Sequence, residues 1–366
     1  MTDIGHRVGR VRERFADVDA LLVTDLTNVR WLTGFTGSSG WVVVLPNEMF
    51  LVTDGRYGEQ ATRQLAAAAV PCDVLVGLSA QATLDHIVRL AGRVECLGFE
   101  AQHVSYQQFV TYEAAITSTL VPTAGIVETG RRTKDPAEVA LIEQACAIAD
   151  AALHDVAPSI RDGLTEADVR NRLEVTMREL GAIGPSYETI VATGPVHAAM
   201  PHHRPTAARI EPGHTVIIDV GALVGGYHSD MTRSFVVGDP SPEQAEMYQV
   251  VLAAQCAGVA AVRPGLTAVE LDAICRDTIA DAGYGDLFTH GTGHGVGLLI
   301  HEDPFVSRTS TAALQVGDVV TVEPGVYREG FGGFRVEDLV LVTSDGCRVL
   351  THSPKDSPCL PSPPTT

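Results

Sequence analysis

The feature that most constrains the fold is an internal repeat in the second part of the chain. Residues 161–168 (RDGLTEAD) match residues 263–270 (RPGLTAVE), and each matched pair of positions is 102 residues apart. In both copies a threonine, Thr165 or Thr267, precedes a helical pattern and an acidic residue follows three positions later, as in a capping box. The repeat indicates that this part of the chain consists of two similar halves.

The helices around the repeat predict how the two halves are built. The helix of each copy ends near a glycine, Gly181 or Gly283, again 102 residues apart. Another helical pattern, over residues 136–156 or 242–262, precedes each copy, and strand-like sequence follows each. Outer helix pairs and inner strands predict a pseudo-symmetric α+β domain with a concave sheet.

A predicted hairpin over residues 216–237 (VIIDVGALVGGYHSDMTRSFVV) carries two aspartates. Asp219 lies in the first apolar run and Asp230 in the second, and Gly225-Gly226 provides the turn. Residues opposite one another, or diagonal by two, share a face of an antiparallel pair, so both carboxylates should point to one side. A carboxylate buried beside such a run needs a compensating cation, which favours a metal site over the alternative, a solvated hairpin with incidental acids.

A second predicted hairpin, over residues 319–342, repeats this pattern with two glutamates. Glu323 interrupts a valine-rich run, and Glu337 lies on the returning strand beyond the turn at residues 330–333. The two glutamates are centred on the turn and can share a face. Arg335 is two residues before Glu337, so it should point the same way.

Histidines in a glycine-rich segment, residues 289–301 (THGTGHGVGLLIH), can join these carboxylates. The glycine spacing is not that of a dinucleotide-binding fingerprint, and no acidic residue is placed to hold a ribose. His294 is a candidate ligand through a neutral ring nitrogen, and His301 follows seven residues later. In one unbroken strand this odd spacing puts the rings on opposite faces, but the glycines allow a kink that brings both to one site. For a lone histidine, a structural role is the alternative.

The candidate ligands form an oxygen-rich set: Asp219, Asp230, His294, Glu323 and Glu337. Four carboxylates and one imidazole leave room for two divalent ions and suit manganese or cobalt, with zinc or iron also possible. Two ions roughly 3.5–4 Å apart can hold a bridging hydroxide and polarise a carbonyl. The residues therefore predict metal-assisted hydrolysis.

Composition limits the possible partners. The chain has 366 residues and a net charge of −19, which argues against nucleic acid because phosphate binding needs a basic surface. No apolar run reaches the roughly 20 residues of a membrane span, and residues 1–10 lack an apolar signal core, so a cytoplasmic protein is expected. The seven scattered cysteines contain no CxxC pair and are interpreted as reduced thiols.

Breaks in the pattern divide the chain into three parts. Residues 1–125 alternate helical and strand patterns, which predicts an α/β domain. Its glycine-rich loop, residues 33–40, lacks the Lys-Ser/Thr ending of a phosphate-binding loop, so on local grounds it is interpreted as a flexible connector. Residues 126–352 form the duplicated domain, and the Pro-rich residues 353–366 are expected to be a disordered tail.

The ordered motifs IDVGA, SDMTR, GTGHGVG, VEPGVY and RVED resemble those of the pita-bread-fold metallopeptidases, the group of methionine aminopeptidases, aminopeptidase P and prolidase. The resemblance covers the second domain, and the internal duplication agrees with the pita-bread pseudo-twofold. It implies that Asp219 binds one metal ion, that Asp230 and Glu337 bridge, and that His294 and Glu323 complete the second site. Glu323 would also handle the proton of the nucleophilic water.

The same resemblance implies roles outside the ligand set. His202, in the segment Met-Pro-His, resembles the histidine that contacts the substrate and stabilises the tetrahedral intermediate. His301 resembles the second such histidine, whereas the neighbouring His203 has no assigned role. Arg335 resembles the substrate-binding arginine of the Xaa-Pro-cleaving branch, since a guanidinium can hold a carboxylate bidentately.

Residues 28–35 (NVRWLTGF) resemble the creatinase/prolidase N-terminal domain, which methionine aminopeptidases typically lack. The resemblance implies a peptidase that cleaves before proline in Xaa-Pro dipeptides or, as the alternative, in longer Xaa-Pro-Xaa peptides like aminopeptidase P. It also implies two divalent ions per subunit, Mn²⁺ first and Co²⁺ or Zn²⁺ next. Relatives are commonly homodimers in which a loop of the N-terminal domain, here residues 34–40, approaches the partner's site.

Two alternatives of another class share this fold. One is a metal-free creatinase-like hydrolase, and the other is a non-catalytic binding module. Both kinds of relative have lost metal ligands, whereas this chain keeps all five, so a metallopeptidase is the expected function.

Overall fold

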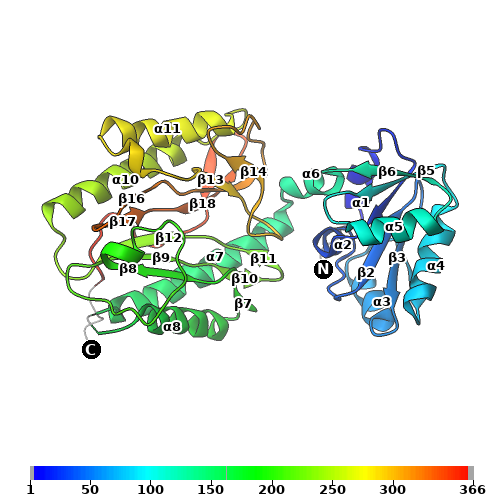
Figure 1. The fold of residues 1–366 in the computed structure, drawn as a ribbon, viewed down its shortest axis with the longest axis horizontal. Helices are drawn as coiled ribbons and strands as arrows, with labels where there is room; N and C mark the ends of the chain where they lie inside the picture. Colours follow the sequence, from blue (N-terminus) through cyan, green and yellow to red (C-terminus); the bar gives the residue numbers. More distant parts are fainter. Residues whose placement is uncertain (1–3, 162, 362–366) are drawn as a thin grey trace. The chain divides into compact units, whose positions relative to one another are not determined.

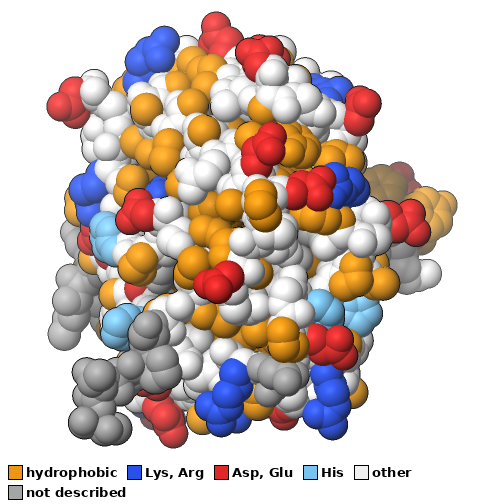
Figure 2. Space-filling view, turned by 90° about the vertical axis from the view of Figure 1, so that its left-hand side faces the viewer, with side chains coloured by type: hydrophobic (Ala, Val, Ile, Leu, Met, Phe, Trp, Pro, Cys, Tyr) orange, Lys and Arg blue, Asp and Glu red, His pale blue; other side chains and the backbone are white. Residues whose placement is uncertain are grey.

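The computed structural model describes residues 4–161 and 163–361, so Asp162 of the sequence repeat lies outside the described residues. The chain divides into two compact units, Met1–Arg131 and Arg132–Thr366, which are described separately. Figure 2 shows one face of the molecule, on which acidic and basic side chains are interspersed with hydrophobic ones. Among the described residues, no helix is long and apolar enough to cross a membrane.

The first unit is built on a six-stranded mixed sheet, in agreement with the α/β pattern of its sequence. The strand order is β4-β3-β2-β1-β5-β6; β2 runs antiparallel to both its neighbours, and the other neighbouring pairs are parallel. The predicted boundary after residue 125 falls just before α6, most of which belongs to this unit. The elements are α1 (Arg7–Arg12), β1 (Ala20–Val23), α2 (Leu26–Thr33), β2 (Gly40–Val44), β3 (Met49–Asp54), α3 (Gly58–Ala67), β4 (Asp73–Gly77), α4 (Ala80–Ala91), β5 (Cys96–Glu100), α5 (Tyr106–Ala115), β6 (Thr119–Thr123) and α6 (Ile126–Arg132).

The second unit begins with a helix pair and strands that form its first half. The helix α7 packs against α8, and β8, β9 and β12 form a sheet in the order β12-β9-β8. A smaller sheet has the order β11-β10-β7. The elements are α7 (Pro136–Val156), η1 (Ala157–Ser159), α8 (Glu166–Glu179), β7 (Gly184–Pro185), β8 (Ile190–Thr193), α9 (Gly194–His197), β9 (Thr215–Asp219), β10 (Ala222–Val224), β11 (Tyr227–His228) and β12 (Thr232–Val236).

The second half of this unit repeats the arrangement. The helix α10 packs against α11, and the strands form sheets in the orders β14-β13-β15-β18-β19 and β16-β17. In Figure 1 the pair α7 and α8 lies on one side of the strands and the pair α10 and α11 on the other. The elements are α10 (Pro242–Ala261), α11 (Ala268–Asp281), η2 (Gly285–Leu287), β13 (Gly293–Gly295), β14 (Glu302–Val306), β15 (Val319–Val322), β16 (Gly325–Arg328), β17 (Gly332–Arg335), β18 (Asp338–Val342) and β19 (Cys347–Val349).

Backbone contacts confirm the internal duplication. The predicted threonines cap α8 and α11, each within a capping box. Before α8, Gly163 N donates to Ile210 O; before α11, Gly265 N donates to Leu314 O in the same way. Each half also has its own cluster of buried apolar side chains. The two halves are therefore repeats in structure as well as in sequence.

Neither predicted hairpin is a single uninterrupted ladder, which corrects the sequence-based expectation. Asp219 at the end of β9 pairs with Thr232 of β12, and the chain between them enters another sheet through β10 and β11. Likewise β15 pairs with β18, whereas β16 pairs with β17 in a separate sheet. The four predicted acidic ligands lie next to these breaks, where one ladder ends and a side chain can leave the core.

The segment after β19 differs from the predicted disordered tail. Ser353 O accepts bonds of 2.9 and 2.7 Å from the buried Arg233, and Lys355 forms an ion pair with Asp338. Val236 N donates to Pro358 O over 2.7 Å, which adds the segment to the edge of β12. The prediction of disorder is therefore wrong for residues 353–361, and residues 362–366 lie outside the described residues.

Candidate metal centre

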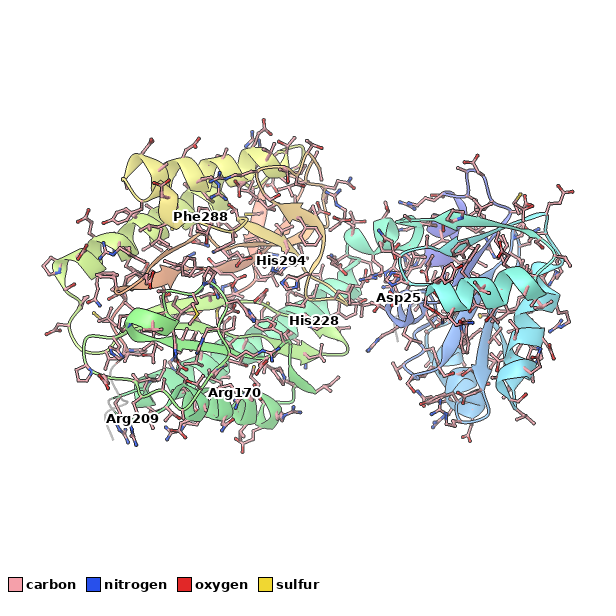
Figure 3. All side chains as sticks on the ribbon, viewed as in Figure 1. Asp25, Arg170, Arg209, His228, Phe288 and His294 are labelled. Carbon is pink, nitrogen blue, oxygen red and sulfur yellow. The ribbon has the colours of Figure 1, made fainter. Side chains whose placement is uncertain are left out.

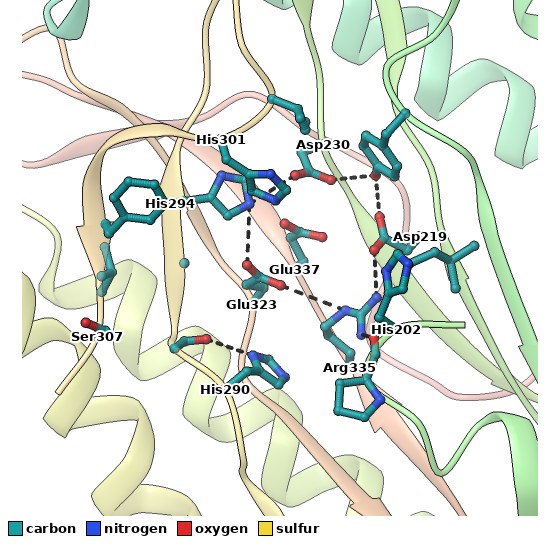
Figure 4. Close-up of a pocket in the computed structure, with 18 of the residues that line it drawn as sticks. His202, Asp219, Asp230, His290, His294, His301, Ser307, Glu323, Arg335 and Glu337 are labelled. Carbon is teal, nitrogen blue, oxygen red and sulfur yellow. Dashed lines mark hydrogen bonds and ion pairs between the residues drawn. The ribbon is translucent and has the colours of Figure 1, made fainter. Parts of the chain in front are cut away.

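One pocket of the second unit contains every residue that the sequence singled out for chemistry. The cavity has a volume of about 660 Å³. It is lined by all the predicted ligands and by the other predicted site residues: Asp219, Asp230, His294, Glu323, Glu337, His202, His301 and Arg335. Figure 4 shows these side chains converging from both halves of the unit.

The ligand-type side chains reach the pocket from strand ends. Asp219 ends β9, Asp230 precedes β12, Glu323 follows β15 and Glu337 precedes β18. His294 lies in the middle of the short strand β13, among the central strands of the unit in Figure 3. The four acids are thus fixed at the ends of paired strands, and His294 is fixed within a strand.

Three of these residues have mutual distances that suit a metal ion. Asp230, His294 and Glu337 each offer one ligand atom, and these three atoms lie within 4.8 Å of one another. His294 Nε2 is 3.4 Å from Asp230 Oδ2 and 3.6 Å from Glu323 Oε1. The carboxylates and the imidazole therefore surround a common point.

The chemistry of this donor set fits a divalent cation. Burial, and then the neighbouring acids, raise the pKa of Asp230 and of Glu337 well above the usual range, and burial raises the pKa of Glu323 to about 8. Glu337 Oε1 is buried and has no hydrogen-bond partner among the described residues. Acids packed this closely repel one another unless positive charge lies among them, so the residues fit a metal site.

His294 is prepared to act as a neutral ligand. Burial, and then His301, lower the pKa of His294 to about 4, which keeps the ring uncharged at neutral pH. Its Nδ1–H donates to Gly295 O over 3.1 Å, which leaves the lone pair of Nε2 facing Asp230 and Glu323.

The residue before His294 must be a glycine because there is no space for a side chain at that position. A Cβ on Gly293 would lie 2.1 Å from Thr321 O of the neighbouring strand. A side chain at that position would push β13 away from β15 and move the imidazole out of the pocket. Close packing of the strands therefore explains a glycine next to His294, and nucleotide binding is not needed to explain it.

Tyr187, a residue that the sequence reasoning missed, joins the two aspartates. Its hydroxyl oxygen is hydrogen-bonded to Asp219 Oδ1 and lies 2.5 Å from Asp230 Oδ1. One hydroxyl proton can be donated to only one of them at a time. Burial, and then the two aspartates, raise the pKa of Tyr187 well above its ordinary value, so the hydroxyl remains a donor.

Arg335 is largely engaged within the protein. Its Nη2 donates to Asp219 Oδ2 over 2.7 Å, and its Nη1 donates to Pro201 O and to Tyr327 Oη, each over 2.8 Å. Its Nε donates to Thr232 Oγ1 over 3.0 Å. The predicted position beside the carboxylates is therefore observed, but a bidentate grip on a substrate carboxylate would require Arg335 to release some of these partners.

The two predicted catalytic histidines lie on different sides of the carboxylates. His301 lies next to His294, with ring centroids 4.3 Å apart, and His202 lies near Asp219 and Arg335 in Figure 4. A third histidine, His290, also lines the pocket. It lies within the same glycine-rich segment, and that clustering was the only signal in the sequence that could have found it.

A pocket of buried acids and a neutral imidazole, in a duplicated α+β domain that follows an α/β domain, is the arrangement of a pita-bread metallopeptidase. The sequence profile described as Metallopeptidase family M24 matches residues 140–344. The profile of the Creatinase/Prolidase N-terminal domain matches residues 7–133. The chain therefore belongs to metallopeptidase family M24, which confirms the resemblance and implies divalent metal at this site.

Individual relatives are similar over both units. The chain is 43% identical over 340 residues to "Uncharacterized peptidase YqhT" of Bacillus subtilis, covering 93% of this chain and 95% of that one. It is 36% identical over 341 residues to the "Xaa-Pro dipeptidase" of Pyrococcus furiosus, again covering 93% and 95%. The solved structure "Xaa-Pro dipeptidase from Bacillus anthracis" superposes with a TM-score of 0.94 at 39% identity, covering 98% of this chain and 100% of that one.

Proposed function

We propose that this protein is a metal-dependent exopeptidase that hydrolyses the peptide bond before proline in Xaa-Pro dipeptides. The observation that carries the proposal is the pocket itself, which brings five ligand-type residues together with two histidines and an arginine. Relatives that match almost the whole chain, in sequence and in structure, are named Xaa-Pro dipeptidase. The metal-free and non-catalytic alternatives are not favoured, because this chain retains the complete donor set.

The donor set would hold two divalent ions, of which Mn²⁺ is our first choice and Co²⁺ or Zn²⁺ the next. We assign Asp219 to one ion, Asp230 and Glu337 to both, and His294 and Glu323 to the other. When bound, such ions supply an activated water and polarise the scissile carbonyl. Every other part of the mechanism is carried out by the side chains of this chain.

Glu323 is the residue that accepts the proton of the attacking water. Its carboxylate points into the pocket, with Oε1 3.6 Å from His294 Nε2 and Oε2 4.0 Å from Arg335 Nε. Arg335 thus provides fixed positive charge near a carboxylate that must change its protonation state during turnover.

His202 and His301 contact the substrate from two sides and donate hydrogen bonds to its carbonyl and to the tetrahedral intermediate. Arg335 fixes Asp219 and the carbonyl of Pro201 in the free protein, and we assign to it a substrate contact that forms when a peptide enters. We place the protein in the cytoplasm as a homodimer, in which residues 34–40 approach the partner's pocket.

The test is hydrolysis of an Xaa-Pro dipeptide beside an Xaa-Pro-Xaa tripeptide, each with Mn²⁺ and with EDTA. Chelator-sensitive cleavage of the dipeptide alone is the expected result. Preference for the tripeptide would replace the dipeptidase by an aminopeptidase of the Xaa-Pro type. Cleavage of neither peptide by the metal-loaded protein would overturn the substrate class.

A further inference from the structure

A buried carboxylate outside the metal centre lies at the first turn of α8. Glu166 is fully buried, and its two oxygens accept five hydrogen bonds. Oε1 accepts from Thr193 N (2.9 Å) and His197 Nδ1 (2.8 Å). Oε2 accepts from His203 Nε2, Thr206 N and Thr206 Oγ1, each over 2.9 Å.

These partners enclose one segment of the chain, residues 193–206. Glu166 holds both its ends, and inside it the rings of His197 and His203 stack with centroids 4.1 Å apart. His202 lies in this segment, between His203 and Pro201, and the carbonyl of Pro201 accepts a bond from Arg335. The predicted catalytic histidine is therefore fixed on one side by Arg335 and on the other by Glu166.

The second half of the domain contains a matching device. Asp272 of α11 is buried, and its Oδ1 accepts from Thr292 N (3.1 Å) and from Thr292 Oγ1 (2.9 Å). This is the bond pair that Thr206 makes with Glu166. Thr292 precedes His294 by two residues. In both halves, therefore, a carboxylate on a helix accepts hydrogen bonds from a threonine in the segment that carries a histidine of the pocket.

The contacts of Glu166 identify it as a positioning residue and not as a metal ligand. Glu166 with His197 and His203 has the composition of a metal site, and their ligand atoms lie within 4.8 Å of one another. A carboxylate offers about four lone-pair sites. The amides of Thr193 and Thr206 can only donate, and together with the threonine hydroxyl and the two imidazoles they occupy all of that capacity.

We propose that Glu166 positions His202 for catalysis by anchoring His203 and Thr206 on one side of it and Thr193 on the other. The inference rests on the proposed function, because it assigns the geometry of His202 to a residue that does not touch the substrate. Glu166 is therefore expected to affect turnover only through His202, and metal binding not at all.

The experiment is a double-mutant cycle on Glu166→Gln and His202→Ala, measured as kcat and KM for an Xaa-Pro dipeptide. Glu166→Gln keeps the size of the side chain but turns one oxygen into a donor that faces other donors. Misplacement of His202 is expected to lower kcat roughly 10–100-fold, with metal content and KM unchanged. In the His202→Ala background, Glu166→Gln should cause no further loss, because the group that it positions is gone.

An equal loss in both backgrounds would overturn the proposal, since Glu166 would then support the fold in general. Asp168→Asn is the matched control: Asp168 lies in the same first turn, is exposed, and accepts hydrogen bonds from Thr165 with its side chain, so kcat should remain unchanged. A loss with Asp168→Asn equal to that with Glu166→Gln would also overturn the proposal. If Glu166→Gln does not fold, His203→Ala removes one of the anchors and should show the same non-additivity in a smaller effect.

Crystal structures of the wild-type protein and of Glu166→Gln separate this proposal from the proposed function. A displaced His202 ring supports positioning even if the wild-type protein cleaves no Xaa-Pro dipeptide, which would overturn the function alone. An unmoved ring, or a metal ion bound to Glu166 in the wild-type protein, would overturn the positioning role.

Discussion

The two halves of the second unit share the same arrangement of helices and strands, but the acidic side chains that they place in the pocket have different contacts. In the first half, Asp219 and Asp230 are linked by Tyr187, and Asp219 is also held by Arg335. In the second half, Glu337 Oε1 has no hydrogen-bond partner within residues 4–161 and 163–361, and its surroundings supply mainly negative charge. Duplication therefore conserved helix caps and strand ends, whereas the contacts of the ligands diverged.

The duplicated helices also show how the segments that carry His202 and His294 are fixed. On α8, Glu166 accepts the hydrogen bond of a threonine hydroxyl, and on α11 Asp272 does so. The sequence repeat, however, aligns Glu166 with Ala268. The carboxylate occupies a different helix position in each half, but it performs the same task. The comparison teaches that the repeat preserves the threonine caps at aligned positions, whereas the carboxylate that binds the second threonine has changed its position on the helix.

The largest expected effects come from the ligands that are assigned to both ions, one from each half. Asp230→Ala and Glu337→Ala should each lower kcat at least about a thousandfold, because each would remove a ligand that we assign to both ions. Metal content, measured by mass spectrometry, should fall in both. Asp239→Ala changes an exposed acid beyond β12 and serves as the control. Substantial turnover in either ligand variant would break the assignment of a two-ion site shared by the halves.

The two histidines that we assign to catalysis, one from each half, give the next effect. His202→Ala and His301→Ala should each lower kcat roughly 10²–10⁴-fold, as is typical when a positioned donor is lost. Both variants should keep their full metal content, because neither histidine belongs to the ligand set. Loss of metal from His202→Ala would mean that this residue has been misplaced among the catalytic groups.

Two of the candidate ligands could be predicted because they interrupt apolar runs. Asp219 follows three apolar residues and Glu323 follows a valine-rich strand, so burial of a charge was evident in the sequence. The register supports the reasoning: Asp219 pairs with Thr232, two residues after Asp230, which puts the aspartates on the diagonal of one face. The breaks between the sheets were not predicted, because the alternation of apolar and polar residues does not change where a chain passes from one sheet to another.

Other contacts could not be predicted because they join residues distant in the chain. Tyr187 lies in the connection between β7 and β8, and only the tertiary fold brings its hydroxyl to the aspartates. Glu166 has the sequence context of any first-turn acid of a helix. Ser353 is in a Pro-rich end whose composition is typical of disorder, yet Arg233 reaches its carbonyl across 120 positions. Amino-acid composition alone cannot show that a Pro-rich segment has a hydrogen-bond partner elsewhere in the chain.

Tyr187→Phe tests the asymmetry between the two halves. It removes the hydroxyl that holds Asp219 and Asp230 and leaves the ring in place. We expect a loss of roughly 10–100-fold in metal affinity or kcat, the usual consequence of removing a group that orients metal ligands. A metal titration followed by activity measures both. Tyr248→Phe is the control, since its hydroxyl bonds to Lys355 O, away from the pocket. Unchanged affinity and kcat in Tyr187→Phe would show that the aspartates need no such partner.

The smallest expected effect concerns the rim of the pocket, which the first half supplies with an exposed ion pair. Arg204 and Glu188 both line the pocket, 3.1 Å apart, with 78% and 46% of their side chains exposed. Because Arg335 is engaged within the protein, Arg204 is the more accessible guanidinium for the carboxylate of a dipeptide. An exposed ion pair contributes about 1 kcal/mol or less, so Arg204→Gln should raise KM for an Xaa-Pro dipeptide about 2–5-fold and leave kcat unchanged. The corresponding Xaa-Pro amide, which lacks the carboxylate, should bind both proteins equally; an equal rise in its KM would assign Arg204 to the shape of the rim and not to charge recognition.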